Sequence, residues 1–128
     1  CTVASAPSAL PRATAVRAAL VQLTSATGPA ESLRRLLPLV ARAAGGGADL
    51  VCTPEVTNMV APREVLRARA VAEGDDPVLA ALREEAARRG LWVAVGSLAL
   101  REGEALVNRS LLLDPSGAVA ARYDKVHM

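Results

Sequence analysis

Five short apolar stretches along the chain are predicted to be buried strands. They are rich in Val, Leu and Ala and are bounded by Gly, Pro or acidic residues. The stretches are residues 15–23, 48–55, 91–100, 105–114 and 118–125. Segments with helical periodicity separate the first three stretches, whereas short turns separate the last three. The order β-α-β-α-α-β-β-β, with later strands joined by short turns, predicts an α/β fold with a mixed sheet.

The first predicted helix lies between the first two strands. Pro29 suits a first helical turn. The glycines at 45–47 are expected to end the helix rather than bind phosphate, since a phosphate loop follows a strand. Pro38 is expected to kink or split the helix, because proline has no backbone N–H to donate. The side chains expected on its inward face are Leu33, Leu36, Leu37, Val40 and Ala44.

Two further helices are predicted before the third strand. Residues 62–73 show helical spacing of their apolar positions. The side chains expected to face inward there are Val65, Leu66 and Ala70. Residues 74–90 begin with acidic residues, place Pro77 in the first turn and end at Gly90. Those signals mark both ends of a helix.

The composition narrows the classes of function. The chain is 52% hydrophobic but has one Trp, one Tyr and no Phe, so its core is expected to be aliphatic. So few aromatic residues disfavour a single-stranded nucleic-acid binder, which stacks bases on aromatic rings. The net charge of +2 is spread among both signs without a basic stripe for phosphates. No apolar run approaches the ~20 residues of a membrane span. Neither nucleic acid nor a membrane is therefore expected as a partner.

The N-terminal segment and the two cysteines give indications of the cellular location of the protein. Residues 1–14 are rich in Ala, Ser, Pro and Thr, contain no acid, and are expected to be a disordered lead-in. A transit-peptide remnant and a lipidated N-terminal Cys are the weaker alternatives. Cys1 and Cys52 lie far apart in unlike contexts, which argues against a disulfide framework. A reducing, cytoplasmic location fits that usage.

Glu55 is a candidate general base. It follows an apolar strand and a proline. Ligands of α/β sheets gather at the carboxyl ends of strands. Burial at such a position raises a carboxyl pKa toward that of a general base. From the residues alone, a loop carboxylate or a cap for the next helix is an equal alternative.

Lys125 is the only lysine, whereas the other fourteen basic residues are arginines. A compact ammonium suits a single oxygen better than a planar guanidinium does, so Lys125 is a candidate oxyanion stabiliser. A solvated strand-end charge beside Tyr123 and Asp124 is the alternative. His127, the only histidine, is interpreted as structural, with ligand binding or loop orientation as alternatives. Because both follow strand ends, we expect Glu55 and Lys125 to lie close together at one edge of the sheet.

Cys52 is not predicted to be a nucleophile. It lies in an apolar strand beside Leu50 and Val51, where a free cysteine is usually an inert core residue. Alternation along a regular strand also places it on the face opposite Glu55. The sequence contains no Ser-His-Asp set, and one His without a paired Cys makes no zinc site.

Four blocks of the sequence occur together in a recognisable order and spacing. They are AALVQLTS (18–25), GADLVCTPE (47–55), GLWVAVGSLAL (90–100) and VNRSLLLDPSGAVAARYDKVHM (107–128). In this arrangement they resemble the N-terminal half of a nitrilase-superfamily carbon–nitrogen hydrolase. The resemblance is nearest to the small-amide amidases that include omega-amidase and deaminated glutathione amidase.

The resemblance implies a Glu-Lys-Cys catalytic triad. The family glutamate follows the second strand in a motif like TPE here, which implies Glu55 as the general base. The family lysine lies in a Tyr-x-Lys-x-His motif. This motif implies Lys125 as the oxyanion stabiliser, with Tyr123 and His127 supporting the site. The family cysteine lies in a later block that this chain does not reach, so the nucleophile is expected outside it.

The resemblance also implies an architecture and partners. The family fold is a four-layer αββα sandwich, so residues 15–128 are expected to be the N-terminal portion of that domain, without its nucleophilic half. The implied substrate is a small-molecule amide, with no metal or organic cofactor. A homodimer or higher homo-oligomer is implied for the full-length enzyme, and the chain alone is expected to be inactive.

Two other readings of the sequence stay open. One is a catalytically dead binding or interaction module of the same fold. The other, from a different class, is a Rossmann-like ligand-binding domain. The absence of a glycine-rich turn after the first strand disfavours the Rossmann-like reading.

Overall fold

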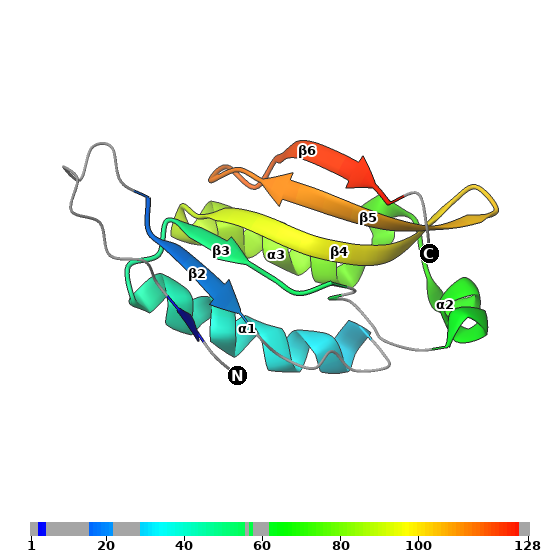
Figure 1. Cartoon of the computed structure of the whole chain (residues 1–128), viewed down its shortest axis with the longest axis horizontal. Coiled ribbons are helices and arrows are strands. Elements are labelled where there is room, and N and C mark those ends of the chain that lie inside the picture. Colours follow the sequence, from blue (N-terminus) through cyan, green and yellow to red (C-terminus); the bar gives the residue numbers. More distant parts are fainter. Residues whose placement is uncertain (1–2, 5–15, 22–28, 56, 58–61, 126–128) are drawn as a thin grey trace.

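Six strands form a single sheet in the order of the chain (Figure 1). The computed structural model describes residues 3–4, 16–21, 29–55, 57 and 62–125. The strands are β1 (Val3–Ala4), β2 (Ala18–Val21), β3 (Leu50–Cys52), β4 (Trp92–Glu102), β5 (Ala105–Leu113) and β6 (Val119–Asp124). β2, β3 and β4 run parallel, whereas β1 pairs antiparallel with β2, and β5 pairs antiparallel with both β4 and β6. The predicted α/β fold with a mixed sheet is confirmed.

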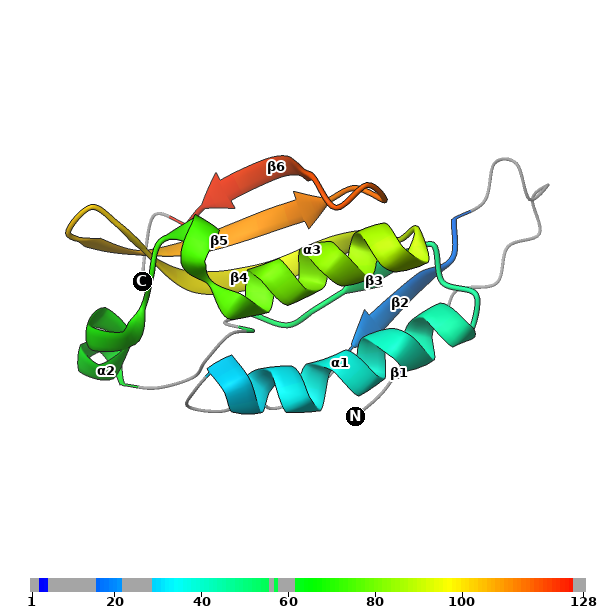
Figure 2. The ribbon, with the colours of Figure 1, turned by 180° about the vertical axis from the view of Figure 1, so that it is seen from behind.

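The two long helices cover one face of this sheet. The helical elements are α1 (Pro29–Gly45), α2 (Arg63–Arg69), the 3₁₀ turn η2 (Glu73–Asp75) and α3 (Pro77–Arg89). Seen from behind, α1 and α3 lie side by side in front of the strands (Figure 2). The short α2 lies at one end of the molecule, where Arg101 of β4 donates to the Arg67 carbonyl. Within the described ranges, no helix is both long and apolar enough to cross a bilayer.

Helix α1 departs from the sequence prediction in two ways. It is continuous through Pro38, which is exposed, so the helix is not split. Its buried face is also rotated from the expected one, and consists of Ser32, Leu36, Leu39, Val40 and Ala43. The side chains of Leu33, Leu37 and Ala44 are only half-buried. Leu and Ala occupy so many positions of this helix that periodicity alone does not locate the centre of its apolar face.

Helix α2 is shorter than predicted and has no buried residue. Ala70, expected inside the helix, is buried but has an extended backbone (φ −64°, ψ 140°) and ends α2. Helix α3, in contrast, begins and ends as predicted. The Asp76 carboxylate accepts a hydrogen bond from the Leu79 N–H at 2.8 Å, and Gly90 takes the left-handed conformation (φ 66°) that ends the helix.

Strand β1 was not expected from the sequence. Val3 and Ala4 pair with Val21 and Leu20 of β2. The other residues of the expected disordered lead-in, 1–14, lie outside the described residues.

The core between helices and sheet is aliphatic, as predicted. Its largest fully buried apolar side chains are Leu36, Val40, Val51, Val78, Leu82, Val93, Leu98, Leu100 and Leu113. The opposite face of the sheet carries a second apolar row. In register across β2 to β6, this row consists of Leu20, Cys52, Ala94, Leu112 and Ala121. None of the described helices packs on this side, which we call the open face. The chain thus supplies one sheet and one helical layer of a layered α/β fold.

Candidate active site

Glu55 lies in a tight turn that follows β3. The hydroxyls of Thr53 and Thr57 are hydrogen-bonded at 3.0 Å, and the Thr57 hydroxyl also donates to the Pro54 carbonyl. Both threonines are buried, whereas the Glu55 side chain is 68% exposed. The turn therefore fixes the backbone around Glu55 and leaves its carboxylate accessible, so the burial that the sequence led us to expect at this position is absent.

The Glu55 turn rests on an irregularity in β4. The register of β4 with β5 shifts between Val95 and Leu98, as in a β-bulge. At this point the Gly96 N–H donates to the Thr53 carbonyl at 3.1 Å, and the Thr57 N–H donates to the Ser97 carbonyl at 2.9 Å. Backbone groups of the bulge thus bind the turn. The sequence analysis missed this contact, although a glycine inside an apolar strand is a signal of a bulge or a close backbone approach.

Lys125 directly follows β6, and its ammonium forms an ion pair with the Glu55 carboxylate. The backbone N–H of Lys125 donates to the backbone carbonyl of Asn108 at 2.9 Å, so the β5–β6 pairing continues to Lys125. Because β3 and β6 both run parallel to β4, their carboxyl ends lie at the same edge of the sheet. The expectation that Glu55 and Lys125 lie close together, although seventy positions apart in sequence, is confirmed.

Asn108 is a further polar residue beside Lys125. Its Oδ1 atom is buried and has no hydrogen-bond partner among the residues that the structure describes. Side chains at opposite positions of an antiparallel pair lie on one face, with Cβ atoms about 4.5–5.5 Å apart. Asn108 therefore places an unused acceptor beside the lysine. No role for Asn108 was predicted from the sequence.

The other expected site residues differ in how they are placed. Tyr123 lies on β6, two positions before Lys125, and pairs with Ser110 of β5. It is 65% exposed. His127 lies outside the described residues. Among the residues that are described, no three His, Cys, Asp or Glu side chains gather as a metal site requires.

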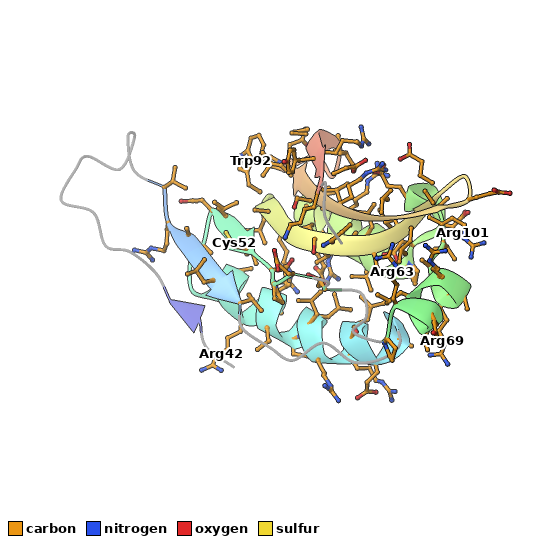
Figure 3. The ribbon with its side chains drawn as sticks, turned by 45° about the vertical axis from the view of Figure 1, so that its right-hand side comes forward. Arg42, Cys52, Arg63, Arg69, Trp92 and Arg101 are labelled. Carbon is orange, nitrogen blue, oxygen red and sulfur yellow. The ribbon has the colours of Figure 1, made fainter. Side chains whose placement is uncertain are left out.

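Cys52 is not the core residue expected from the sequence. It lies half-buried on the open face, away from α1 and its Arg42 (Figure 3). The argument that alternation separates it from Glu55 does not apply, because β3 ends at Cys52. Burial raises the pKa of the Cys52 thiol, which disfavours the reactive thiolate.

A cluster of ion pairs, which we call the Arg109 cluster, lies on the helix-covered side of β5 and β6. Arg109 donates to Asp124 at 2.5 and 3.0 Å, to Glu102 at 2.8 Å and to Glu73 at 3.2 Å. Arg122 donates to Glu73 at 2.8 and 3.1 Å. Hydrogen bonds from Arg122 chiefly lower the pKa of Glu73, and those from Arg109 lower the pKa of Asp124. The cluster ties η2 to the strand end that carries Lys125.

A glutamate and a lysine paired at the carboxyl edge of a mixed sheet agree with the implied class of hydrolase. A family model described as "Carbon-nitrogen hydrolase" matches residues 17–128. The chain therefore belongs to the carbon–nitrogen hydrolase family, as the nitrilase-superfamily resemblance implied.

Curated relatives of the chain include amidases. Over 113 residues it is 36% identical to deaminated glutathione amidase of Yersinia enterocolitica, a match that covers 86% of this chain and 39% of the relative. It is 30% identical to deaminated glutathione amidase of Mus musculus, over 86% of this chain and 36% of the relative. The chain thus spans well under half the length of the curated relatives it matches.

Solved structures of amidases share its fold. A double mutant of the amidase from Nesterenkonia sp. AN1 in complex with acrylamide matches with a TM-score of 0.79 and 32% identity, over 94% of this chain and 46% of that one. A mutant of the same amidase in complex with butyramide matches with a TM-score of 0.78 and 31% identity, over 94% and 47% of the two chains.

Proposed function

We propose that this chain supplies two of the three catalytic groups of an enzyme that hydrolyses a small carboxamide to a carboxylic acid and ammonia. Glu55 acts as the general base and Lys125 stabilises the oxyanion. The observation that carries the proposal is the Glu55–Lys125 ion pair at the carboxyl edge of the sheet, in a chain of the carbon–nitrogen hydrolase family. Residues 15–128 form the N-terminal portion of the hydrolase domain, and the nucleophilic cysteine belongs to its C-terminal half.

The proposed reaction uses the two groups in sequence. Glu55 accepts the proton of the cysteine thiol, and the thiolate attacks the amide carbon. The Lys125 ammonium and a backbone N–H stabilise the tetrahedral oxyanion. The C–N bond then breaks, ammonia leaves with the proton from Glu55, and a thioester remains. Glu55 next takes a proton from water, whose oxygen attacks the thioester. The C–S bond then breaks, the carboxylic acid leaves, and Glu55 returns the proton to the cysteine thiolate.

The pairing of the two side chains suits these roles. The carboxylate of Glu55 is accessible and forms an ion pair with the Lys125 ammonium, so the proposed base and the proposed oxyanion stabiliser lie side by side. Lys125 carries three N–H donors, so a donor is left for an oxyanion while another contacts Glu55. Tyr123 and His127 are proposed to support the site. The chemistry requires no metal or organic cofactor.

The substrate class rests on the relatives. The structural neighbours were solved with acrylamide and butyramide, both small primary amides. We propose a small-molecule amide as substrate, a homo-oligomeric complete enzyme and a cytoplasmic location.

Ammonia release from short aliphatic amides tests the proposal in the complete enzyme that contains this chain. Glu55→Gln keeps the size of the side chain but cannot accept a proton, and we expect kcat to fall by at least about 10³-fold. Glu104→Gln, a matched change at an exposed hairpin position, is expected to leave kcat unchanged. Full activity in the Glu55→Gln enzyme would reject the general-base role, and no hydrolysis by the unchanged enzyme would favour the catalytically dead module.

The chain alone provides a second test. We expect it to release no ammonia, because neither of its cysteines is placed as the nucleophile. Turnover by the chain that disappears in Cys52→Ala would show that Cys52 had been wrongly excluded.

A further inference from the structure

We infer that Gly96 and Ser110 are positioning residues for Glu55, and that strand β5 sets the spacing between Glu55 and Lys125. This inference rests on the proposed function, in which both side chains act on one substrate. In this proposal Gly96 and Ser110 do not contact the substrate or the reacting atoms. They act through the bulge of β4 and the turn that carries Glu55.

The space beside Gly96 is filled by the backbone of the Glu55 turn. A Cβ atom added at Gly96 would lie 2.4 Å from the Thr53 carbonyl oxygen and 2.6 Å from the carbonyl carbon and oxygen of Pro54. Real Cβ atoms essentially never come closer than 3.0 Å to such neighbours. Gly96 does not have the positive φ that requires glycine at positions such as Gly90. Glycine is therefore needed here for the close approach of the turn, not for its backbone conformation.

Hydrogen bonds link Gly96 to the Glu55 turn on one side and to strand β5 on the other. Its N–H points to the Thr53 carbonyl at 3.1 Å and to the Thr53 hydroxyl at 3.3 Å. Its carbonyl accepts a hydrogen bond from the Ser110 hydroxyl at 2.7 Å. The bulge frees these groups from the regular ladder, because a bulged residue is left unpaired. Ser110 of β5 thus binds the carbonyl of Gly96, and the N–H of the same glycine binds the Glu55 turn.

The same strand also holds Lys125. Asn108 and Ser110 are two positions apart on β5, so alternation places their side chains on the same face. The backbone carbonyl of Asn108 accepts a hydrogen bond from the backbone N–H of Lys125 at 2.9 Å. The Ser110 hydroxyl donates to the Gly96 carbonyl. One rigid strand therefore carries the supports of both charged groups. If the Ser110 support is lost, Glu55 shifts relative to Lys125 while the substrate contacts made elsewhere remain.

The test measures kcat and KM for ammonia release in the complete enzyme. Ser110→Ala is expected to lower kcat about tenfold and Gly96→Ala about 100-fold, with KM within about twofold, since small misplacements of catalytic groups cost rate rather than binding. Ser110→Thr retains the hydroxyl and is expected to restore most of kcat.

Two variants control for the loss of a hydroxyl and the gain of a methyl group. Ser116→Ala removes a serine hydroxyl that donates to Asp114 at 2.5 Å in the β5–β6 turn, remote from Glu55. Gly74→Ala adds a Cβ where no atom lies within 4 Å. Both are expected to keep the kcat and KM of the unchanged enzyme.

The outcomes separate this inference from the proposed function. An unchanged enzyme without amidase activity rejects the proposed function. An active enzyme in which Ser110→Ala keeps full kcat overturns the inference, and so does a Ser110→Thr enzyme as impaired as Ser110→Ala. If Gly96→Ala does not fold, the two Ser110 variants still decide. A fall in kcat that is confined to Ser110→Ala and Gly96→Ala supports the positioning role.

Discussion

The choice of lysine at position 125 has a local physical reason. Lys125 faces a single carboxylate, and its side chain is 30% exposed at the end of β6. An ammonium is a compact charge whose three donors can turn toward different oxygens, whereas a guanidinium presents a wide, planar fork. In the proposed mechanism Lys125 contacts Glu55 and a developing oxyanion together, which favours lysine in a chain whose other basic residues are all arginines.

Lys125→Arg is predicted to leave folding intact and to lower kcat by about 10²–10³-fold, because the larger guanidinium cannot occupy a site for one oxyanion. Ammonia release and a thermal melt of the complete enzyme measure the two effects. The matched control is Arg122→Lys, three positions earlier on the same strand, which keeps a cation beside Glu73. It is expected to retain activity. An active Lys125→Arg enzyme would show that any cation serves at this position.

At the scale of elements, the Arg109 cluster joins η2 to β5 and β6. Arg109 is 11% exposed and contacts three carboxylates, which belong to Glu73, Glu102 and Asp124. Buried or partly buried arginine needs such partners to offset the loss of hydration. Because Asp124 directly precedes Lys125, the cluster also steadies the strand end that carries the proposed oxyanion stabiliser.

The cluster predicts a dependence of stability on pH. The pKa of Glu73 is lowered in the folded state below its ordinary value of 4.5, chiefly by hydrogen bonds from Arg122. A lowered pKa stabilises the fold above the ordinary value, and this stabilisation is lost as the pH falls through 4.5 toward the folded-state pKa. Glu73→Gln is therefore expected to lower Tm by about 2–4 °C at neutral pH and by less at pH about 4.

Thermal melts of the complete enzyme at the two pH values measure the effect of Glu73→Gln. Glu104→Gln, the same change at an exposed position, is expected to shift Tm little at either pH. An equal loss of Tm at both pH values would attribute the effect of Glu73→Gln to packing rather than to charge.

At the scale of the whole molecule, one face of the sheet carries the helices and the other is open. Leu20 and Trp92, on the open face, are 51% and 40% exposed. The strand register places half-buried Leu50 opposite Trp92 and half-buried Cys52 opposite Leu20. Contiguous apolar area of this kind marks a surface that is covered in the working protein. In the proposed complete enzyme, a second sheet covers it.

The isolated chain is predicted to be poorly folded or to self-associate through the open face. Burial of apolar surface contributes ~25 cal/mol per Å², and net stability is only ~5–15 kcal/mol even for complete domains. Size-exclusion chromatography with a thermal melt measures both properties. Trp92→Gln is expected to reduce association, whereas Val71→Gln, at an exposed apolar position outside the sheet, is not. A clean monomer with a sharp cooperative transition would contradict this prediction.

Much of the fold was encoded in local signals. Asp76, Pro77 and Gly90 mark the ends of α3 because caps and fixed φ angles act within a single turn. Strands β2 to β6 were recognisable because apolar runs bounded by Gly, Pro or acidic residues are typical of buried strands. Glu55 and Lys125 were predicted to lie at one edge of the sheet from their positions after strand ends, and their ion pair confirms that proximity.

Only the tertiary structure decided what depends on distant partners. The rotation of α1, the face that Cys52 occupies and the pairing of β1 depend on which surfaces meet, which periodicity does not specify. The bulge at Gly96 and the Arg109 cluster require groups far apart in sequence to meet at hydrogen-bond distance. The sequence by itself thus determined strands β2 to β6, the two long helices and the two charged residues proposed for the site. The geometry that joins those residues came from long-range packing, because local propensity carries no information about which distant groups fill the space beside a strand.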